Sequence, residues 1–102
     1  RFHLIAAAQA LARAGSGGIA AGLMSHSIGS PPIAKLGSPE LKQKVLPGVL
    51  AGDKISALAI TEPNAGSDVA SLKTNARRDG DHYIVRGEKT FITSGMRADY
   101  YT

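Results

Sequence analysis

The stretch Ala59-Ile60-Thr61-Glu62-Pro63-Asn64-Ala65-Gly66-Ser67-Asp68 decides the interpretation of this chain. An aliphatic run ends at Pro63, which has no N–H and therefore ends the hydrogen-bond ladder of a strand. Gly66 allows the backbone to approach a ligand closely, and the Ser67 hydroxyl stands beside backbone N–H groups that suit phosphate oxygens. These residues alone leave two interpretations open, a ligand-binding loop and an ordinary turn.

Upstream of this stretch the apolar spacing is helical. Glycine and proline clusters at residues 15–18 and 29–32 interrupt the pattern, and Pro47 is expected to end it. Ser38 is a predicted N-cap, with Pro39 and Glu40 in the first helical turn. The predicted helices cover residues 1–14, 19–28, 31–36 and 38–46.

Downstream, β-branched and aromatic residues predict short strands. Asp79-Gly80-Asp81 between two alternating runs is typical of a hairpin. The predicted strands cover residues 55–60, 73–78, 82–86 and 89–93, and Tyr100-Tyr101-Thr102 resembles the start of another. Helices followed by antiparallel strands predict an α+β chain, with residues 1–52 as one part and 53–102 as the other.

Composition excludes several classes of function. The 102 residues contain no cysteine, so neither a disulfide framework nor a thiolate nucleophile is expected. The net charge of +4 comes from scattered basic residues, a pattern that disfavours nucleic-acid binding but allows an anionic ligand. No apolar stretch is long enough for a membrane span. His3, His26 and His82 lack metal-ligand spacing, so we expect no metal site.

Three acidic or nucleophilic residues are candidate catalytic groups but are not expected to act as such. Glu62 and Asp68 do not form an acid–base pair, and we expect Glu62 to hold its loop through an ion pair. Ser67 has no evident histidine base, which argues against a hydrolase triad.

Residues 59–71 resemble the signature segment of the acyl-CoA dehydrogenase family, with Thr-Glu, Gly-Ser-Asp and the small Ser71 in place. A second family feature follows at the expected separation, Phe91-Ile92-Thr93-Ser94-Gly95. The hairpin at 79–89, the Gly37-Ser38-Pro39-Glu40 stretch and Leu46-Pro47 also resemble the family. This resemblance implies a fragment of the acyl-CoA dehydrogenase fold, in which residues 1–52 end the N-terminal helical domain and residues 53–102 begin a β-barrel-like middle domain.

The resemblance also implies an FAD site. Backbone atoms of 58–60 and the Thr61 hydroxyl would face the isoalloxazine, while Gly66 and Ser67 would reach the pyrophosphate. Phe91, where many relatives have tryptophan, would pack against the flavin, and Thr93 would hydrogen-bond near N5. The implied cofactor-binding residues are Leu58, Ala59, Ile60, Thr61, Gly66, Ser67, Phe91, Ile92 and Thr93.

Substrate contacts are implied at Ser67, Met24 and Ile28, the last two beside the acyl chain. For Met24 and Ile28 the competing interpretation is ordinary core packing. For Phe91 and Thr93 it is a strand pair with one side chain facing inward and one outward.

The implied reaction is α,β-dehydrogenation of an acyl-CoA, with hydride transfer to FAD. The catalytic glutamate is expected beyond Thr102, so the 102 residues alone are expected to be inactive. The implied partners are an electron-transfer flavoprotein or similar acceptor and further subunits of a tetramer. The location would be cytoplasmic in a bacterium and the mitochondrial matrix in a eukaryote.

Two alternatives stay open at this point. One is an enzyme of the same fold with different flavin chemistry, an acyl-CoA oxidase or a flavin monooxygenase. The other is a non-catalytic binding or scaffold fragment. Both chain ends resemble cuts, since Arg1 opens directly into a helical pattern and Thr102 interrupts a strand pattern.

Overall fold

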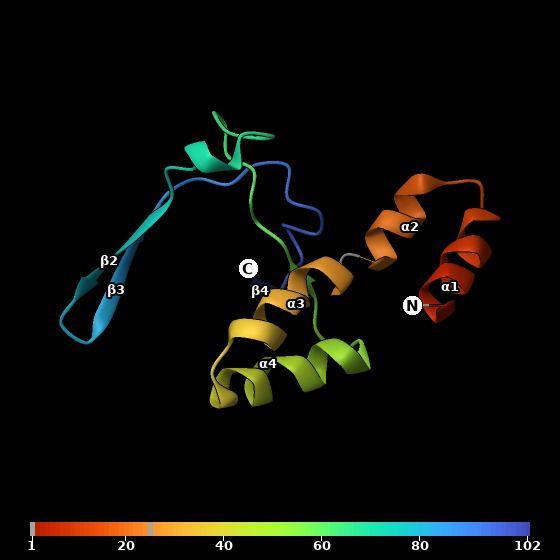
Figure 1. Ribbon diagram of the computed structural model, residues 1–102, viewed down its shortest axis with the longest axis horizontal. Helices are drawn as coiled ribbons and strands as arrows, with labels where there is room; N and C mark the ends of the chain where they lie inside the picture. Colours follow the sequence, from red (N-terminus) through yellow and green to blue (C-terminus); the bar gives the residue numbers. More distant parts are fainter. Residues whose placement is uncertain (1, 25) are drawn as a thin grey trace.

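In the part of the chain that the structure describes, four helices precede the strands, which confirms the α+β prediction (Figure 1). The computed structural model describes residues 2–24 and 26–102, so the predicted helix start at Arg1 and the position of Ser25 lie outside the described residues. The elements are α1 (Phe2–Ala12), α2 (Gly17–Met24), α3 (His26–Leu36), α4 (Pro39–Ala51), β1 (Ser56–Ala57), the 3-10 turn η1 (Val69–Ser71), β2 (Asn75–Asp79), β3 (His82–Arg86) and β4 (Tyr100–Tyr101).

Helix α4 begins as its sequence predicts and ends later. The Ser38 hydroxyl accepts a hydrogen bond from Leu41 N at 3.2 Å, and Gly52 ends the helix in the left-handed region with φ 85°. The prediction that Pro47 ends this helix was wrong. A proline costs the helix one hydrogen bond, but continuation to Ala51 puts Val49 beside Val45 in the core, where they are 4% and 2% exposed.

Helix α3 also differs from its prediction. Residues 29–32 were expected to interrupt one helix and open another, but α3 runs unbroken through Pro31 and Pro32. The backbone φ of proline is compatible with a helix. The continuous helix places Gly29 and Ile33 on the side that contacts the rest of the chain, where both are buried.

The core lies where α3 and α4 meet the first and last strands. Ile33, Val45 and Val49 form it, and Tyr100 of β4 packs against them. Ala57 of β1 is also fully buried. Figure 1 shows α1 and α2 as a separate pair at one side of the molecule.

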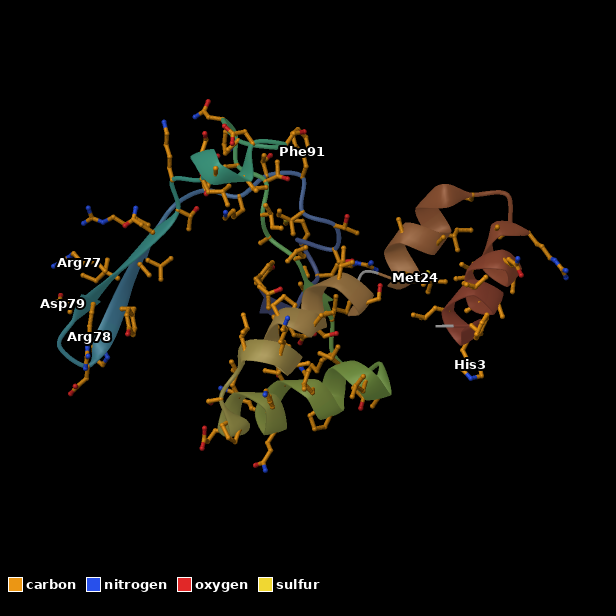
Figure 2. The ribbon with its side chains drawn as sticks, in the orientation of Figure 1. His3, Met24, Arg77, Arg78, Asp79 and Phe91 are labelled. Carbon is orange, nitrogen blue, oxygen red and sulfur yellow. The ribbon has the colours of Figure 1, made fainter. Side chains whose placement is uncertain are left out.

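Of the four predicted strands, those at 73–78 and 82–86 form as β2 and β3, and the described residues contain two small sheets. The hairpin β2–β3 is antiparallel as expected, with Arg77 opposite Ile84, and it projects away from the helices (Figures 1 and 2). The predicted strand 55–60 is reduced to Ser56–Ala57, and it pairs parallel with β4. The predicted strand 89–93 does not form, because Phe91 has a positive φ of 55° that a pleated strand cannot accommodate.

The described part of the chain contains no helix long and apolar enough to cross a membrane. It also contains no group of three or more potential metal ligands.

The close contact between α3 and β1 gives a stability prediction. A Cβ built on Gly29 would lie 2.7 Å from Ser56 Oγ and 2.8 Å from the Ser56 carbonyl carbon, so we expect Gly29→Ala to destabilise the chain by about 1–3 kcal/mol. The matched control is Gly22→Ala, another helical position, where a Cβ meets nothing within 4 Å. Because alanine favours helices, the control is expected to unfold at the same temperature or slightly higher. Thermal unfolding followed by circular dichroism measures both, and equal melting temperatures for the two variants would contradict the prediction.

Candidate functional site

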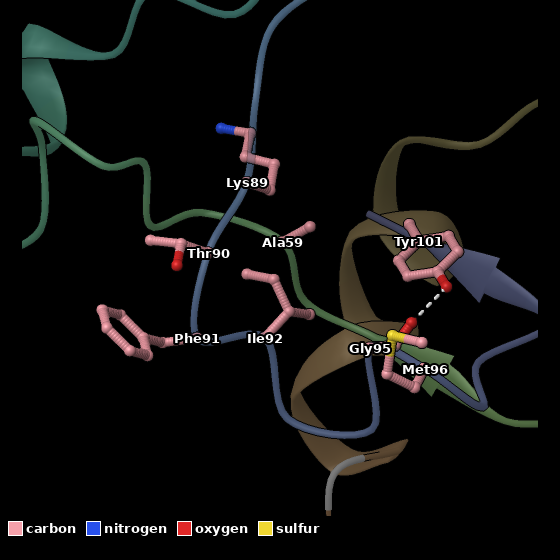
Figure 3. A pocket seen from close by; sticks show the side chains of 8 residues that line it. All are labelled: Ala59, Lys89, Thr90, Phe91, Ile92, Gly95, Met96 and Tyr101. Carbon is pink, nitrogen blue, oxygen red and sulfur yellow. Dashed lines mark hydrogen bonds between the residues drawn. The ribbon is translucent and has the colours of Figure 1, made fainter.

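A cleft lies between the start of the Thr61 loop and the irregular segment that precedes β4 (Figure 3). Its volume is about 520 Å³, within the range of small-molecule sites. Apolar surface dominates the walls, with lysine, threonine and tyrosine groups among them. The lining residues are Ala59, Lys89, Thr90, Phe91, Ile92, Gly95, Met96 and Tyr101.

Backbone hydrogen bonds bring the walls of this cleft together. Thr90 N donates to Thr61 O at 2.9 Å, which joins segments almost thirty residues apart. Ala59 N donates to Thr102 O at 2.6 Å and holds the same wall against the last residues. The Tyr101 hydroxyl donates to Gly95 O at 2.6 Å and closes one end (Figure 3).

The segment after Lys89 is a compact turn with unusual backbone geometry. Gly95 N donates to Ile92 O at 2.8 Å, while Phe91 and Ser94 adopt positive φ values of 55° and 63°. For a bulky side chain such a conformation costs on the order of 1–3 kcal/mol. It turns the Phe91 ring outward, away from Tyr101, and leaves that side chain 92% exposed (Figure 3).

Glu62 is the buried acidic group behind the cleft. Its carboxylate accepts hydrogen bonds from Lys73 N at 2.7 Å, Thr74 N at 2.9 Å and Lys89 Nζ at 2.9 Å. The predicted ion pair of Glu62 is therefore confirmed, with Lys89 as partner. The Thr74 hydroxyl, the Lys73 N–H, Lys89 and the Thr74 N–H lower the pKa of Glu62 to about 2.

The loop after Glu62 is shaped by its own backbone. Glu62 N donates to Ala65 O at 2.8 Å and Ala65 N donates back at 3.1 Å, which closes a turn over Pro63 and Asn64. Ala65 is buried, whereas Gly66 and Ser67 are exposed. The Ser71 hydroxyl donates to the Asp68 carboxylate and completes the short turn η1.

The predicted site residues are only partly brought together. Ala59, Phe91 and Ile92 line the cleft. The segment that contains Ala59 forms one wall of the cleft and includes Leu58, Ile60 and Thr61. Thr93 lies exposed in the turn after Ile92. Outside the cleft lining are Gly66 and Ser67 in the exposed loop, Met24 at the end of α2 and Ile28 in α3, where Ile28 is 53% exposed. Figure 2 shows Met24 on the α2 side of the molecule and Phe91 on the strand side.

Five lining residues were not predicted: Lys89, Thr90, Gly95, Met96 and Tyr101. The sequence signal for Lys89 was its position two residues before Phe91, next to a predicted ligand segment. Tyr101 gave no signal, because its place depends on the parallel pairing of β1 with β4.

The lowered pKa of Glu62 generates a pH-dependent prediction. Its carboxylate stabilises the fold fully above its ordinary pKa of 4.5, and this contribution is lost as the pH falls through the folded-state value of about 2. Glu62→Gln should therefore lower the melting temperature at pH 7, and the difference from wild type should shrink as the pH falls from about 4.5 toward 2. Glu88→Gln, at an exposed position in the same segment, is the matched control and should unfold like wild type. Melting curves across this pH range are the measurement, and a difference that stays constant with pH would refute the assignment.

Both halves of the chain resemble known protein domains. Residues 1–53 match the family model described as the acyl-CoA dehydrogenase N-terminal domain, and residues 57–102 match the model for the acyl-CoA dehydrogenase middle domain. The acyl-CoA dehydrogenase apdG of Emericella nidulans is 49% identical over 95 residues, which cover 90% of this chain and 22% of that protein.

Two solved structures show the same likeness. A probable acyl-CoA dehydrogenase from Mycobacterium abscessus superimposes with a TM-score of 0.81 and 53% identity, over 85% of this chain and 23% of that one. An acyl-CoA dehydrogenase complexed with FAD from Bacillus anthracis superimposes with a TM-score of 0.77 and 43% identity, over 83% of this chain and 15% of that one. The chain thus spans about a fifth of the length of these relatives. With both family models matched in order along its length, the chain belongs to the acyl-CoA dehydrogenase family.

Proposed function

We propose that this chain forms one wall of the flavin site in a longer FAD-dependent acyl-CoA dehydrogenase. In this proposal residues 1–52 end the helical domain and residues 53–102 begin the middle domain. The enzyme would remove the α-proton and β-hydride of an acyl-CoA thioester. The chain covers about a fifth of its relatives, so the remainder of the site would come from other parts of the protein.

The observation that carries the proposal is the convergence of two segments on one cleft. The 58–61 and 89–93 segments, which the family resemblance assigns to the flavin, are joined by Thr90 N to Thr61 O and by Lys89 Nζ to Ile60 O, each at 2.9 Å. Ala59 and Ile92 supply apolar walls. Such a cleft fits a flat ring whose faces are apolar and whose edges carry hydrogen-bonding atoms.

The chemistry that bound FAD supplies is acceptance of the substrate's β-hydride. The residues of this chain would orient and hold the cofactor. Thr93, in the turn beside the cleft, would offer a hydroxyl donor near the ring, and a positioned donor stabilises charge that develops during hydride transfer. The exposed Phe91 ring would cover an apolar face, and Gly66 and Ser67 would offer small, polar contacts to phosphate groups.

The base for the α-proton would come from outside these residues. Glu62 is unsuited to the role, because its carboxylate is buried and already bonded to Lys73, Thr74 and Lys89. Its pKa of about 2 also makes it a weak base at neutral pH. An electron-transfer flavoprotein or similar acceptor would regenerate the oxidised enzyme, and the whole protein would assemble as a tetramer.

The full-length protein tests this proposal directly. We expect it to carry bound flavin, visible by its absorbance, and to oxidise acyl-CoA thioesters with an artificial electron acceptor faster than with oxygen. The isolated 102 residues should show no turnover and only weak FAD binding. A full-length protein without flavin would favour a non-catalytic scaffold. Faster turnover with oxygen would favour an oxidase. Turnover by the isolated 102 residues would contradict the proposal that the catalytic base lies outside them.

A substitution at Thr93 tests its proposed donor role. In the full-length protein Thr93→Val removes the hydroxyl and keeps the shape, so kcat should fall roughly tenfold or more while acyl-CoA binding changes little. Thr93→Ser keeps the hydroxyl and should stay within about threefold of wild type. Steady-state kinetics with a saturating acceptor compares the two, and equal kcat values for valine and serine would remove Thr93 from the mechanism.

A further inference from the structure

Lys89 makes two contacts that separate it from the other lysines of the chain. Its Nζ donates to the Glu62 carboxylate at 2.9 Å and to the backbone carbonyl of Ile60 at 2.9 Å. The lysine side chain is 24% exposed and the glutamate 7%. Its stem also lines the cleft next to Thr90 (Figure 3). One side chain therefore connects the buried carboxylate, the Ala59–Thr61 wall and the cleft.

The carbonyl contact has a geometric effect on the wall. A trans peptide is planar, so its C=O and the following N–H point in opposite directions. Because the Lys89 ammonium group donates a hydrogen bond to the Ile60 carbonyl, the N–H of Thr61 must point away from that ammonium group. Thr90 N donates a hydrogen bond to the Thr61 carbonyl at 2.9 Å, which fixes the plane of the Thr61–Glu62 peptide.

Both peptide planes around Thr61 are thus fixed from the 89–90 segment. Thr90 contributes a backbone N–H, which every substitution except proline retains. Lys89 contributes a side chain, so the orientation of the Ile60–Thr61 peptide depends on the identity of one residue.

Glu62 in turn fixes the position of Lys89. Two backbone N–H groups, from Lys73 and Thr74, hold the Glu62 carboxylate in place from the side of β2. The ammonium group then has an anchored acceptor on one side and the Ile60 carbonyl on the other. A charge-assisted bond of this kind is stronger than a neutral one and resists displacement by water.

We propose that Lys89 is a positioning residue of the flavin site, which sets the orientation of the Ile60–Thr61 peptide and so the donors that this wall presents to the cofactor. The inference rests on the proposed function, since it takes the cleft to be the flavin site. It adds a residue whose effect reaches the cofactor through the backbone of another segment. Lys89 itself takes no part in the chemical step.

The test uses the full-length holoprotein and three variants. Lys89→Met removes the ammonium group and keeps the length of the stem. Lys89→Arg keeps a positive charge for Glu62, but its planar, forked head cannot occupy the same single point between two acceptors. Lys44→Met, at an exposed position on α4, controls for the loss of one positive charge.

For Lys89→Met we expect FAD affinity of the apoprotein to fall about tenfold, the visible absorption band of the bound flavin to shift, and kcat to fall at least about tenfold with KM changed less. Lys89→Arg should recover most of the melting temperature yet keep a shifted band and a reduced kcat. Lys44→Met should match wild type in every measurement. Where Lys89→Met yields no folded protein, the arginine variant carries the test.

The outcomes separate this inference from the proposed function. A wild-type protein without flavin would overturn both. If wild type holds FAD and turns over acyl-CoA, but a folded Lys89 variant shows unchanged affinity, spectrum and kcat, then Lys89 only stabilises the fold and the positioning role is overturned. A lower melting temperature with an unchanged flavin spectrum would lead to the same conclusion.

Discussion

The buried carboxylate of Glu62 is the constraint on which the strand half of this chain depends. A buried charge needs hydrogen-bond partners, and Glu62 obtains them from Lys73 and Thr74, just before β2, and from Lys89. Because the donors come from separate segments, one carboxylate determines how the 61–65 turn, the hairpin base and the cleft wall meet. Apolar contacts contribute less here, since hardly any large side chain of the described residues is fully buried.

A second junction attaches this assembly to the helices. Gly29 of α3 lies against Ser56, and the Thr102 hydroxyl donates to the Gly29 carbonyl at 2.8 Å. On the other side, Lys54 pairs with Asp99 at 2.8 Å, and Asp99 also accepts the Ile55 N–H. The cleft is therefore built on β1 and β4, which are themselves fixed to α3. The positions of the atoms that line the cleft therefore depend on contacts made in the helical half.

Features that depend on neighbouring residues could be predicted from the sequence, whereas features that depend on distant partners could not. The Ser38 cap, the Asp79-Gly80 hairpin and the Glu62 ion pair each arise from neighbouring residues or from a charge that must be paired. The extension of α4 past Pro47 could not be predicted, because it depends on a core that Val49 helps to form. The same holds for Phe91, whose left-handed backbone is imposed by the turn around it and not by its own preference. Of the cleft, Ala59, Phe91 and Ile92 were accessible from motifs, whereas Tyr101 required knowledge of the β1–β4 pairing.

The junction between α3 and the last residues also has a consequence for the order of events during synthesis. Ser56 pairs with Tyr100, and the Thr102 hydroxyl reaches back 73 positions to Gly29. Contacts within helices α1 to α4 join residues close in sequence, so these helices can form as they leave the ribosome. The parallel pairing of β1 with β4 must wait until β4 has emerged. Closing so long a loop costs conformational entropy, and until then the Gly29 carbonyl lacks its Thr102 partner and the Ile33 cluster lacks Tyr100. The proposed cofactor wall is thus a late product of folding, completed only when residues up to Thr102 have been made.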